Sequence, residues 1–190
     1  MWIRKCTFIL AAILLPLCVS AQAPETNARF SVGTDIVTWA NLGTANMNLS
    51  VAAGKNFSIH AEAQYNPWVY KTKVSQMQNK RQQYSLSTRW WPWHVYSGWW
   101  LGGGAQYQEY NRGGMISQTT EEGDAVGLAL SGGYTLMINY FLNIDFSLGF
   151  WGGYKWYTQY SCPKCGRIID DGRKFFLDAN DISIALIFIF

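Results

Sequence analysis

The residues with the most distinctive chemistry are two cysteines in the run Cys162-Pro163-Lys164-Cys165-Gly166. Thiolates separated by two residues bind zinc in many proteins, and in an oxidising compartment they also form disulfides. A closed zinc site needs four ligands, and the chain after residue 21 has no second cysteine pair. Three interpretations stay open: a local disulfide between Cys162 and Cys165, which is favoured, a metal site completed by another chain, and a reduced or redox-active pair.

Two histidines, His60 and His94, are candidates for general-base chemistry. Neither has a serine at a spacing typical of nucleophilic catalysis. We therefore expect no catalytic residues, no enzyme activity and no cofactor.

The segments that must position these residues alternate with a period of two. In 57–65, for example, Ile59 and Ala61 alternate with His60 and Glu62. Successive side chains of a strand point to opposite faces, so each segment has one apolar face and one small or polar face. The pattern predicts eight strands, at 29–39, 45–53, 57–68, 80–92, 98–110, 124–138, 141–160 and 180–190.

The lengths of the strands and of their connections predict the architecture. Most segments have the roughly 9–11 residues that a tilted strand needs to cross a bilayer. Short connections alternate with long polar ones at 69–79, 111–123 and 161–179, as periplasmic turns and outer loops do in outer-membrane barrels. We therefore predict an all-β fold, an eight-stranded antiparallel up-and-down transmembrane β-barrel over residues 29–190, with its polar face inside.

Charged residues on the predicted inner face are the second group of candidate site residues. Asp35, Glu62, Arg89, Asp145 and Lys155 all fall on that face. Buried charges persist in proteins when they are paired, and both signs are present. We expect a mutually paired interior network with a structural role.

The composition agrees with a β protein that contacts lipid. Only 14% of the residues are charged, 16% are aromatic, and the net charge is +3. These values exclude a disordered chain, a collagen and a coiled coil, and they give no reason to expect a nucleic-acid partner.

Aromatic residues gather at both ends of the predicted strands. One group flanks a short turn and consists of Trp90, Trp91, Trp93, Trp99 and Trp100. The other lies toward the opposite ends and consists of Trp68, Tyr107, Tyr110, Trp156 and Tyr157. Two such groups predict the aromatic girdles of a membrane barrel, since amphipathic rings settle at the membrane–water boundary. A carbohydrate-binding platform is the less favoured interpretation.

Both ends of the chain carry features of export. Residues 1–21 read as a cleaved signal peptide, with basic Arg4 and Lys5, an apolar stretch and small residues at the cleavage site, and 22–28 form a short leader. The final segment alternates and ends on Phe190, as does the signal that barrel assembly machinery reads. We therefore expect the outer membrane of a Gram-negative cell, with membrane lipids and the assembly machinery as partners.

Several motifs, taken in their order along the chain, resemble those of a known protein family. They are Tyr65–Trp68, Arg89–Trp93, Tyr110–Gly114, Cys162–Gly166 and the isoleucine-rich end. The chain resembles an uncharacterised domain-of-unknown-function family of Gram-negative gut and oral bacteria. The resemblance implies an outer-membrane barrel, often encoded beside fimbrial genes, and it implies no activity.

These observations favour a non-enzymatic outer-membrane barrel that supports fimbrial or other surface structures through its long outer loops. A small barrel enzyme acting on lipid A or phospholipid is the alternative. A pore is disfavoured, because eight strands leave little interior space beyond that of the side chains.

Overall fold

The computed structural model describes residues 30–71, 76–113, 119–161 and 166–190. The predicted signal peptide at 1–21, the leader at 22–28, and Cys162 and Cys165 lie outside the described residues.

Strands make up nearly all of the described chain. The elements are β1 (Phe30–Asp35), α2 (Ile36–Ala40), β2 (Ala45–Ala52), β3 (Phe57–Asn66), β4 (Val69–Lys71), β5 (Gln76–Trp90), β6 (Gly98–Gly113), β7 (Thr120–Met137), β8 (Leu142–Tyr160) and β9 (Ile168–Ile189).

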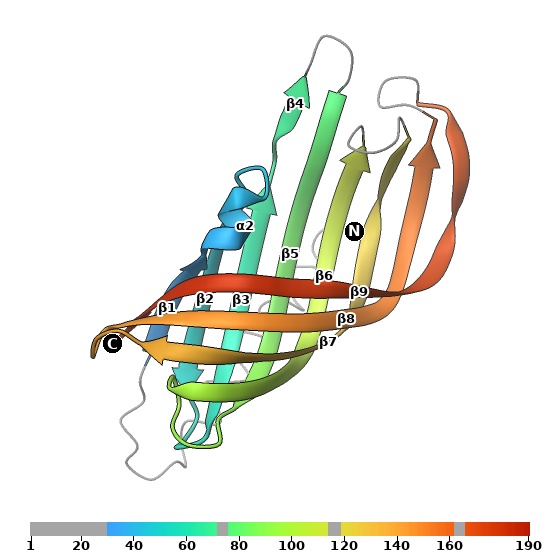
Figure 1. The fold of residues 1–190 in the computed structure, drawn as a ribbon. Coiled ribbons are helices and arrows are strands. Elements are labelled where there is room, and N and C mark those ends of the chain that lie inside the picture. The colour runs from blue at the N-terminus through green and yellow to red at the C-terminus, as the bar shows by residue number, and fades with distance from the viewer. Residues whose placement is uncertain (1–29, 72–75, 114–118, 162–165) are drawn as a thin grey trace, which may run out of the picture.

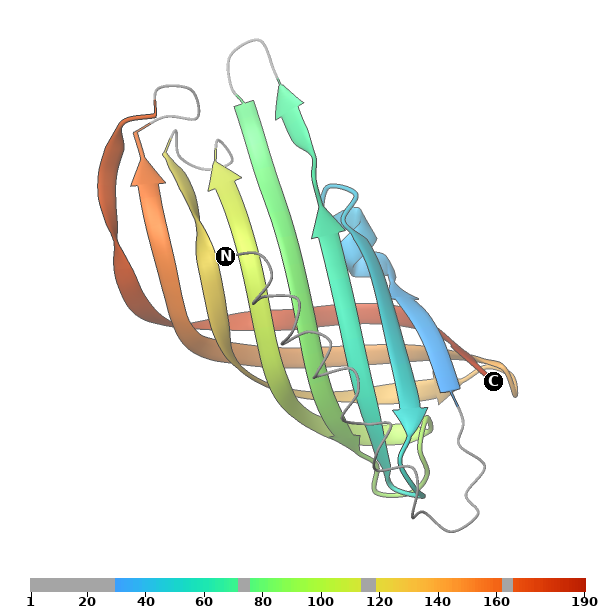
Figure 2. The same cartoon turned by 180° about the vertical axis from the view of Figure 1, so that it is seen from behind.

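Antiparallel pairing closes the sheet into a barrel. Each long strand pairs with the next, β3 pairs with β5, and β9 returns to pair with β1, while the short β4 continues β3 along the same edge of β5. The predicted all-β, eight-stranded antiparallel barrel is therefore confirmed (Figures 1 and 2).

Side chains alternate between the two faces as the sequence predicts. In β3, Ser58, His60 and Gln64 are buried inside the barrel, whereas Phe57 and Tyr65 are exposed on the outside. The polar face therefore fills the interior, and the apolar face forms the outer surface.

The long polar connections are mostly strand, which corrects the prediction for 69–79, 111–123 and 161–179. The strands β5 to β9 continue through these segments and project well beyond β1, β2 and β3 (Figure 1). Polar side chains pair across them: the amide of Gln78 donates to Asn111 at 2.6 Å, and Asn111 donates to Glu122 at 2.7 Å. Their polar composition was typical of loops, yet cross-strand hydrogen bonds stabilise a sheet without an apolar face. We call the parts of β4 to β9 that lie beyond the ends of β1, β2 and β3 the projecting sheet.

The first predicted strand, 29–39, is shorter than expected because a helix interrupts it. The carboxylate of Asp35 accepts hydrogen bonds from the backbone N–H groups of Val37 at 3.0 Å and Thr38 at 3.2 Å. These bonds cap the N-terminus of α2, so β1 ends at Asp35. In the described part of the chain, no helix has the length and apolar character needed to cross a membrane.

Candidate functional site

Three aromatic rings fill the interior at the end of the barrel that carries the 91–97 turn. Trp91, Tyr96 and Trp100 are 0%, 4% and 2% exposed and pack together, with ring centroids 5.9 Å apart for Trp91–Tyr96 and 6.1 Å for Trp91–Trp100. We call them the aromatic plug. The indole N–H of Trp91 donates to Ser58 at 2.9 Å, and the hydroxyls of Tyr96 and Ser50 lie 3.0 Å apart, so the plug is fastened to β2 and β3.

The plug corrects part of the girdle prediction. Trp90 and Trp99 are exposed on the outer surface, but their neighbours Trp91 and Trp100 point inward. A step of one residue along a strand reverses the face, so a run of two tryptophans cannot place both on the outer face.

A second aromatic cluster lies inside the barrel toward the projecting sheet. Tyr110, Ala125, Trp151 and Phe176 are buried together, and the rings of Trp151 and Phe176 meet edge to face at 4.5 Å. Tyr110, predicted for the second girdle, is therefore an interior residue as well.

Between the two clusters lies a polar cavity of about 40 Å³. Trp100 of the plug and Ala129, which packs against the second cluster, both line it. Its polar lining includes His60, Glu62, Ser87, Arg89, Gln106 and Asp145. This space holds only a few water molecules, so side chains occupy most of the interior between the two clusters.

An ion pair between Arg89 of β5 and Asp145 of β8 crosses this interior. Their side chains are 12% and 3% exposed, and the guanidinium Nη1 lies 2.8 Å from the carboxylate Oδ2. Oδ1 of Asp145 accepts from the indole N–H of Trp100 at 2.8 Å and from the hydroxyl of Thr135 at 2.5 Å. The Arg89 guanidinium also lies 3.8 Å from the centroid of the Trp100 ring. Both members of the ion pair therefore contact Trp100 of the aromatic plug from the cavity side.

The other three predicted interior charges have further contacts, although Glu62 lines the same cavity as the Arg89–Asp145 pair. Asp35 caps α2 and accepts a hydrogen bond from the backbone N–H of Ile184 at 3.0 Å. Glu62 accepts from Gln64 at 2.6 Å. Lys155 pairs with Glu121 at 2.7 Å, at the start of the projecting sheet. Glu121 was missed because 111–123 was predicted as a loop, although it continues the inward alternation of β7.

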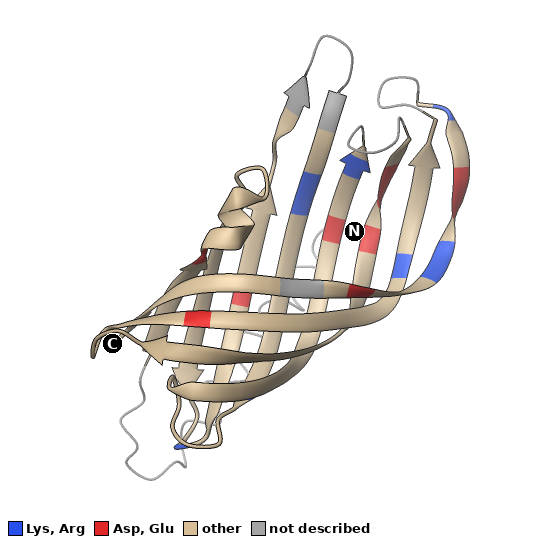
Figure 3. Ribbon diagram, viewed as in Figure 1, with Lys and Arg blue, Asp and Glu red and all other residues tan. Residues whose placement is uncertain are grey.

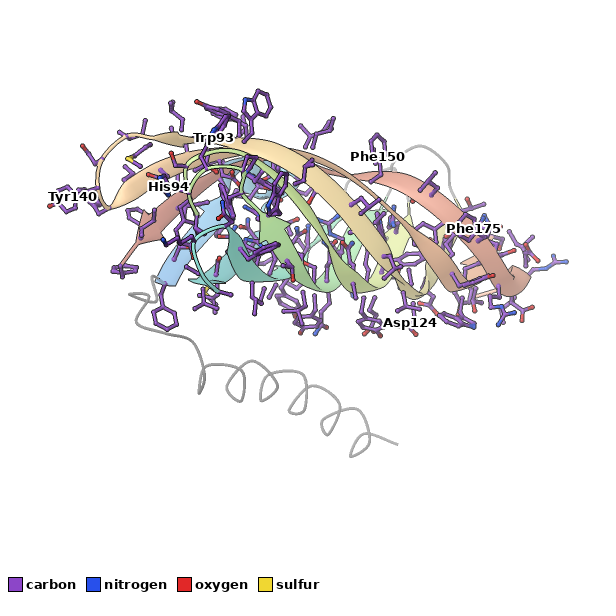
Figure 4. All side chains as sticks on the ribbon, turned by 90° about the horizontal axis from the view of Figure 1, so that it is seen from below. Trp93, His94, Asp124, Tyr140, Phe150 and Phe175 are labelled. Carbon is purple, nitrogen blue, oxygen red and sulfur yellow. The ribbon has the colours of Figure 1, made fainter. Side chains whose placement is uncertain are left out.

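Along the strands, the side chains on the outer surface change from apolar to aromatic and then to charged. On β7 the outward side chains from Val126 to Leu136 are mostly large and apolar, and Leu128 and Leu130 are each 72% exposed. At roughly 3.3 Å per residue and a tilt of about 40°, this stretch is about 25 Å tall. Tyr154 and Trp156 follow on β8, and most charged positions lie beyond them on the projecting sheet (Figure 3). Phe150 and Tyr140 point away from the interior (Figure 4). We call this surface the apolar band.

The residues of the closed barrel, including both aromatic clusters, all match the model of a known sequence family. A family model described as a protein of unknown function, DUF3575, matches residues 7–190. The chain belongs to the DUF3575 family. The predicted membership of an uncharacterised family is thereby confirmed. Among curated proteins, no sequence matches the chain.

The histidines of this DUF3575 barrel occupy very different places. His60 is buried in the cavity, where it faces Ser50 and Ser87 on the two neighbouring strands. The sequence did not reveal these pairings, because the serines are close only through the sheet register. His94 is exposed in the 91–97 turn (Figure 4). Across the described residues, no three His, Cys, Asp or Glu side chains are grouped to hold a metal ion.

Glu121 of the DUF3575 barrel, beyond the apolar band, provides a pH-dependent contact. Burial by itself would raise the pKa of Glu121, but hydrogen bonds from Lys155 and Tyr110 outweigh that effect and hold the pKa below its ordinary value.

Substituting Glu121→Gln should lower the free energy of unfolding by less than about 1 kcal/mol at neutral pH, because the pair is partly exposed. The pKa is lower in the folded state, so the stabilisation is present above the unfolded pKa and is lost as the pH falls through the folded pKa. Urea unfolding of both proteins across a pH series measures this. A difference that stays constant down to the most acidic pH would contradict the assignment.

Proposed function

We propose that this DUF3575 protein is an outer-membrane β-barrel that crosses the bilayer with its eight strands and serves as a docking element for surface structures. One observation carries the proposal: the closed barrel places its polar side chains inside and an apolar band outside. Only lipid or another apolar surface can cover such a band, and a closed barrel leaves no unpaired strand edge in the hydrocarbon region.

The filled part of the interior, between the two aromatic clusters, supports a non-conducting and non-catalytic role. The aromatic plug and the second aromatic cluster lie on either side of a cavity of about 40 Å³. A lipid-modifying enzyme needs its nucleophile and base at a rim that lipid can reach. His60, the histidine with serine neighbours, is buried inside the barrel wall.

The projecting sheet supports the docking role. Five strands, β5 to β9, continue past the apolar band into this sheet, and most of the charged residues lie on it (Figure 3). In the proposed orientation it faces the outside medium, in place of the long outer loops expected from the sequence. Fimbrial or other surface proteins are the proposed partners.

Membrane fractionation with gel electrophoresis tests the membrane proposal. The mature protein should sediment with outer membranes, and unheated samples should migrate differently from boiled ones, because a closed barrel resists detergent unfolding. Recovery in the soluble periplasmic fraction would overturn the proposal.

A further inference from the structure

The strand β9 has an edge that no described strand covers. β8 pairs with β9 along its length, but on the other side β1 reaches only from Ala185 to Ile189. Asp35 then accepts the N–H of Ile184, and above this point no pairing partner is found in the described part of the chain. We call the stretch Ile168–Phe176 the free edge. It forms the outer margin of the projecting sheet (Figures 1 and 2).

An uncovered edge of this length is unusual in a stable sheet. Its N–H and C=O groups form a template on which another chain can pair, and proteins commonly block such templates with prolines, very short strands or charged side chains. The charges of the free edge have both signs, so they restrict its partners to strands with the complementary order of charges rather than block every strand. The free edge contains no proline, and its side chains from Ile168 to Phe175 are all exposed. The backbone is therefore available to a further strand.

The side chains of the free edge follow a symmetric order about Gly172. Two isoleucines and two aspartates precede Gly172, and an arginine, a lysine and two phenylalanines follow it. An antiparallel strand centred on Gly172 places acidic residues opposite Arg173 and Lys174, and basic residues opposite Asp170 and Asp171. Opposite charges across an antiparallel pair stabilise it, and like charges destabilise it. The free edge therefore favours a partner strand in which acidic and basic residues follow the same order as in β9.

Contacts within the barrel hold these charges in position. The Tyr157 hydroxyl donates to the carboxylate of Asp170 at 2.9 Å, and Lys174 lies 4.7 Å from the same ring. Arg173 lies 5.3 Å from the ring of Tyr154. Because these side chains are already oriented, less conformational entropy is lost when a partner binds.

We propose that the free edge of β9 binds an extended peptide segment of a surface protein as an added antiparallel strand. The segment has apolar ends, acidic residues in its first half and basic residues in its second half. This inference rests on the proposed function, because it requires the projecting sheet to face the outside medium. Main-chain hydrogen bonds supply affinity in this mode of recognition, and the side-chain order supplies specificity.

A second copy of the chain is a poor occupant despite the symmetric order. Two copies in one membrane have the same orientation relative to the bilayer, so both β9 strands run toward the membrane. An antiparallel pair would require one barrel to be inverted. The matching order is therefore expected in a different protein.

Binding of a labelled peptide to the full mature protein, folded in lipid nanodiscs, tests the proposal. The first probe, Ile-Ile-Asp-Asp-Gly-Arg-Lys-Phe-Phe, complements the edge in antiparallel register. The second, Ile-Ile-Arg-Lys-Gly-Asp-Asp-Phe-Phe, has the same composition but places like charges opposite. Fluorescence anisotropy should show saturable binding of the first probe and at least about tenfold weaker binding of the second.

Charge reversal in the protein provides the matched variant. Asp170→Lys with Asp171→Lys should lose the first probe and gain binding of Ile-Ile-Asp-Asp-Gly-Asp-Asp-Phe-Phe. The control, Glu109→Lys with Asp124→Lys, makes the same change of charge on the outward face of β6 and β7 and should bind the first probe as the native protein does.

Equal binding of the two equal-composition probes would overturn the proposal, since it would show that the antiparallel order of charges does not select the partner strand. A native dimer in nanodiscs that the Asp170/Asp171 variant dissociates would overturn it in favour of a second copy. Heat-dependent migration reports the folding of each variant. Loss of membrane fractionation counts against the proposed function, whereas failure of peptide binding by a correctly inserted barrel counts only against this inference.

Discussion

Replacing Leu148 by arginine should lower the free energy of unfolding in lipid by about 2–4 kcal/mol, the cost of a cation on the lipid face near the bilayer midplane. Leu148 lies near the middle of the apolar band on β8 and is 53% exposed. In water an exposed leucine tolerates such a change, so the size of the effect measures the surroundings of the band.

Thr158→Arg is the matched control, because it introduces the same side chain on the outward face of the same strand. Thr158 lies beyond Trp156 and pairs with Glu122 and Asp171, which are acidic. The change should stay within about 0.5 kcal/mol, as surface substitutions usually do. Urea unfolding in lipid vesicles measures both variants. Equal effects at the two positions would contradict the placement of the band in the membrane.

Replacing Asp145 by asparagine should destabilise the barrel by about 3–5 kcal/mol, because it leaves the buried guanidinium of Arg89 without its counter-charge. Asp145 Oδ1 also accepts hydrogen bonds from Trp100 and Thr135, and because the neutral amide oxygen of asparagine is a weaker acceptor than a carboxylate, the change also loosens the aromatic plug. Equilibrium unfolding measured by tryptophan fluorescence follows both effects, since Trp91 and Trp100 are buried in the plug.

Removing both charges separates the role of the pair from the cost of an uncompensated charge. The double substitution Arg89→Met with Asp145→Asn should be less destabilising than Asp145→Asn alone, because it removes both charges while the amide oxygen of the asparagine still accepts from Trp100 and Thr135. If the double variant were more destabilised than the single one, the interior would depend on the charges themselves rather than on their mutual neutralisation.

The sequence alone determined the barrel and the direction of its faces. Alternation is a local property, because successive side chains of any strand point to opposite sides. The pattern around Ile59 and His60 therefore predicted an apolar exterior and a polar interior without knowledge of any neighbour. The same rule, applied to each residue, would have placed Trp91 and Trp100 inside, since each follows an outward tryptophan.

Only the tertiary structure decided which interior residues meet. Arg89 and Asp145 are 56 positions apart, and their contact depends on how the strands are staggered when β9 closes on β1. That stagger is a property of the whole barrel and leaves no local trace in the sequence. The same closure pairs Lys155 with Glu121 and brings His60 between two serines. It also leaves the edge of β9 uncovered, because β1 ends at Asp35 where α2 begins.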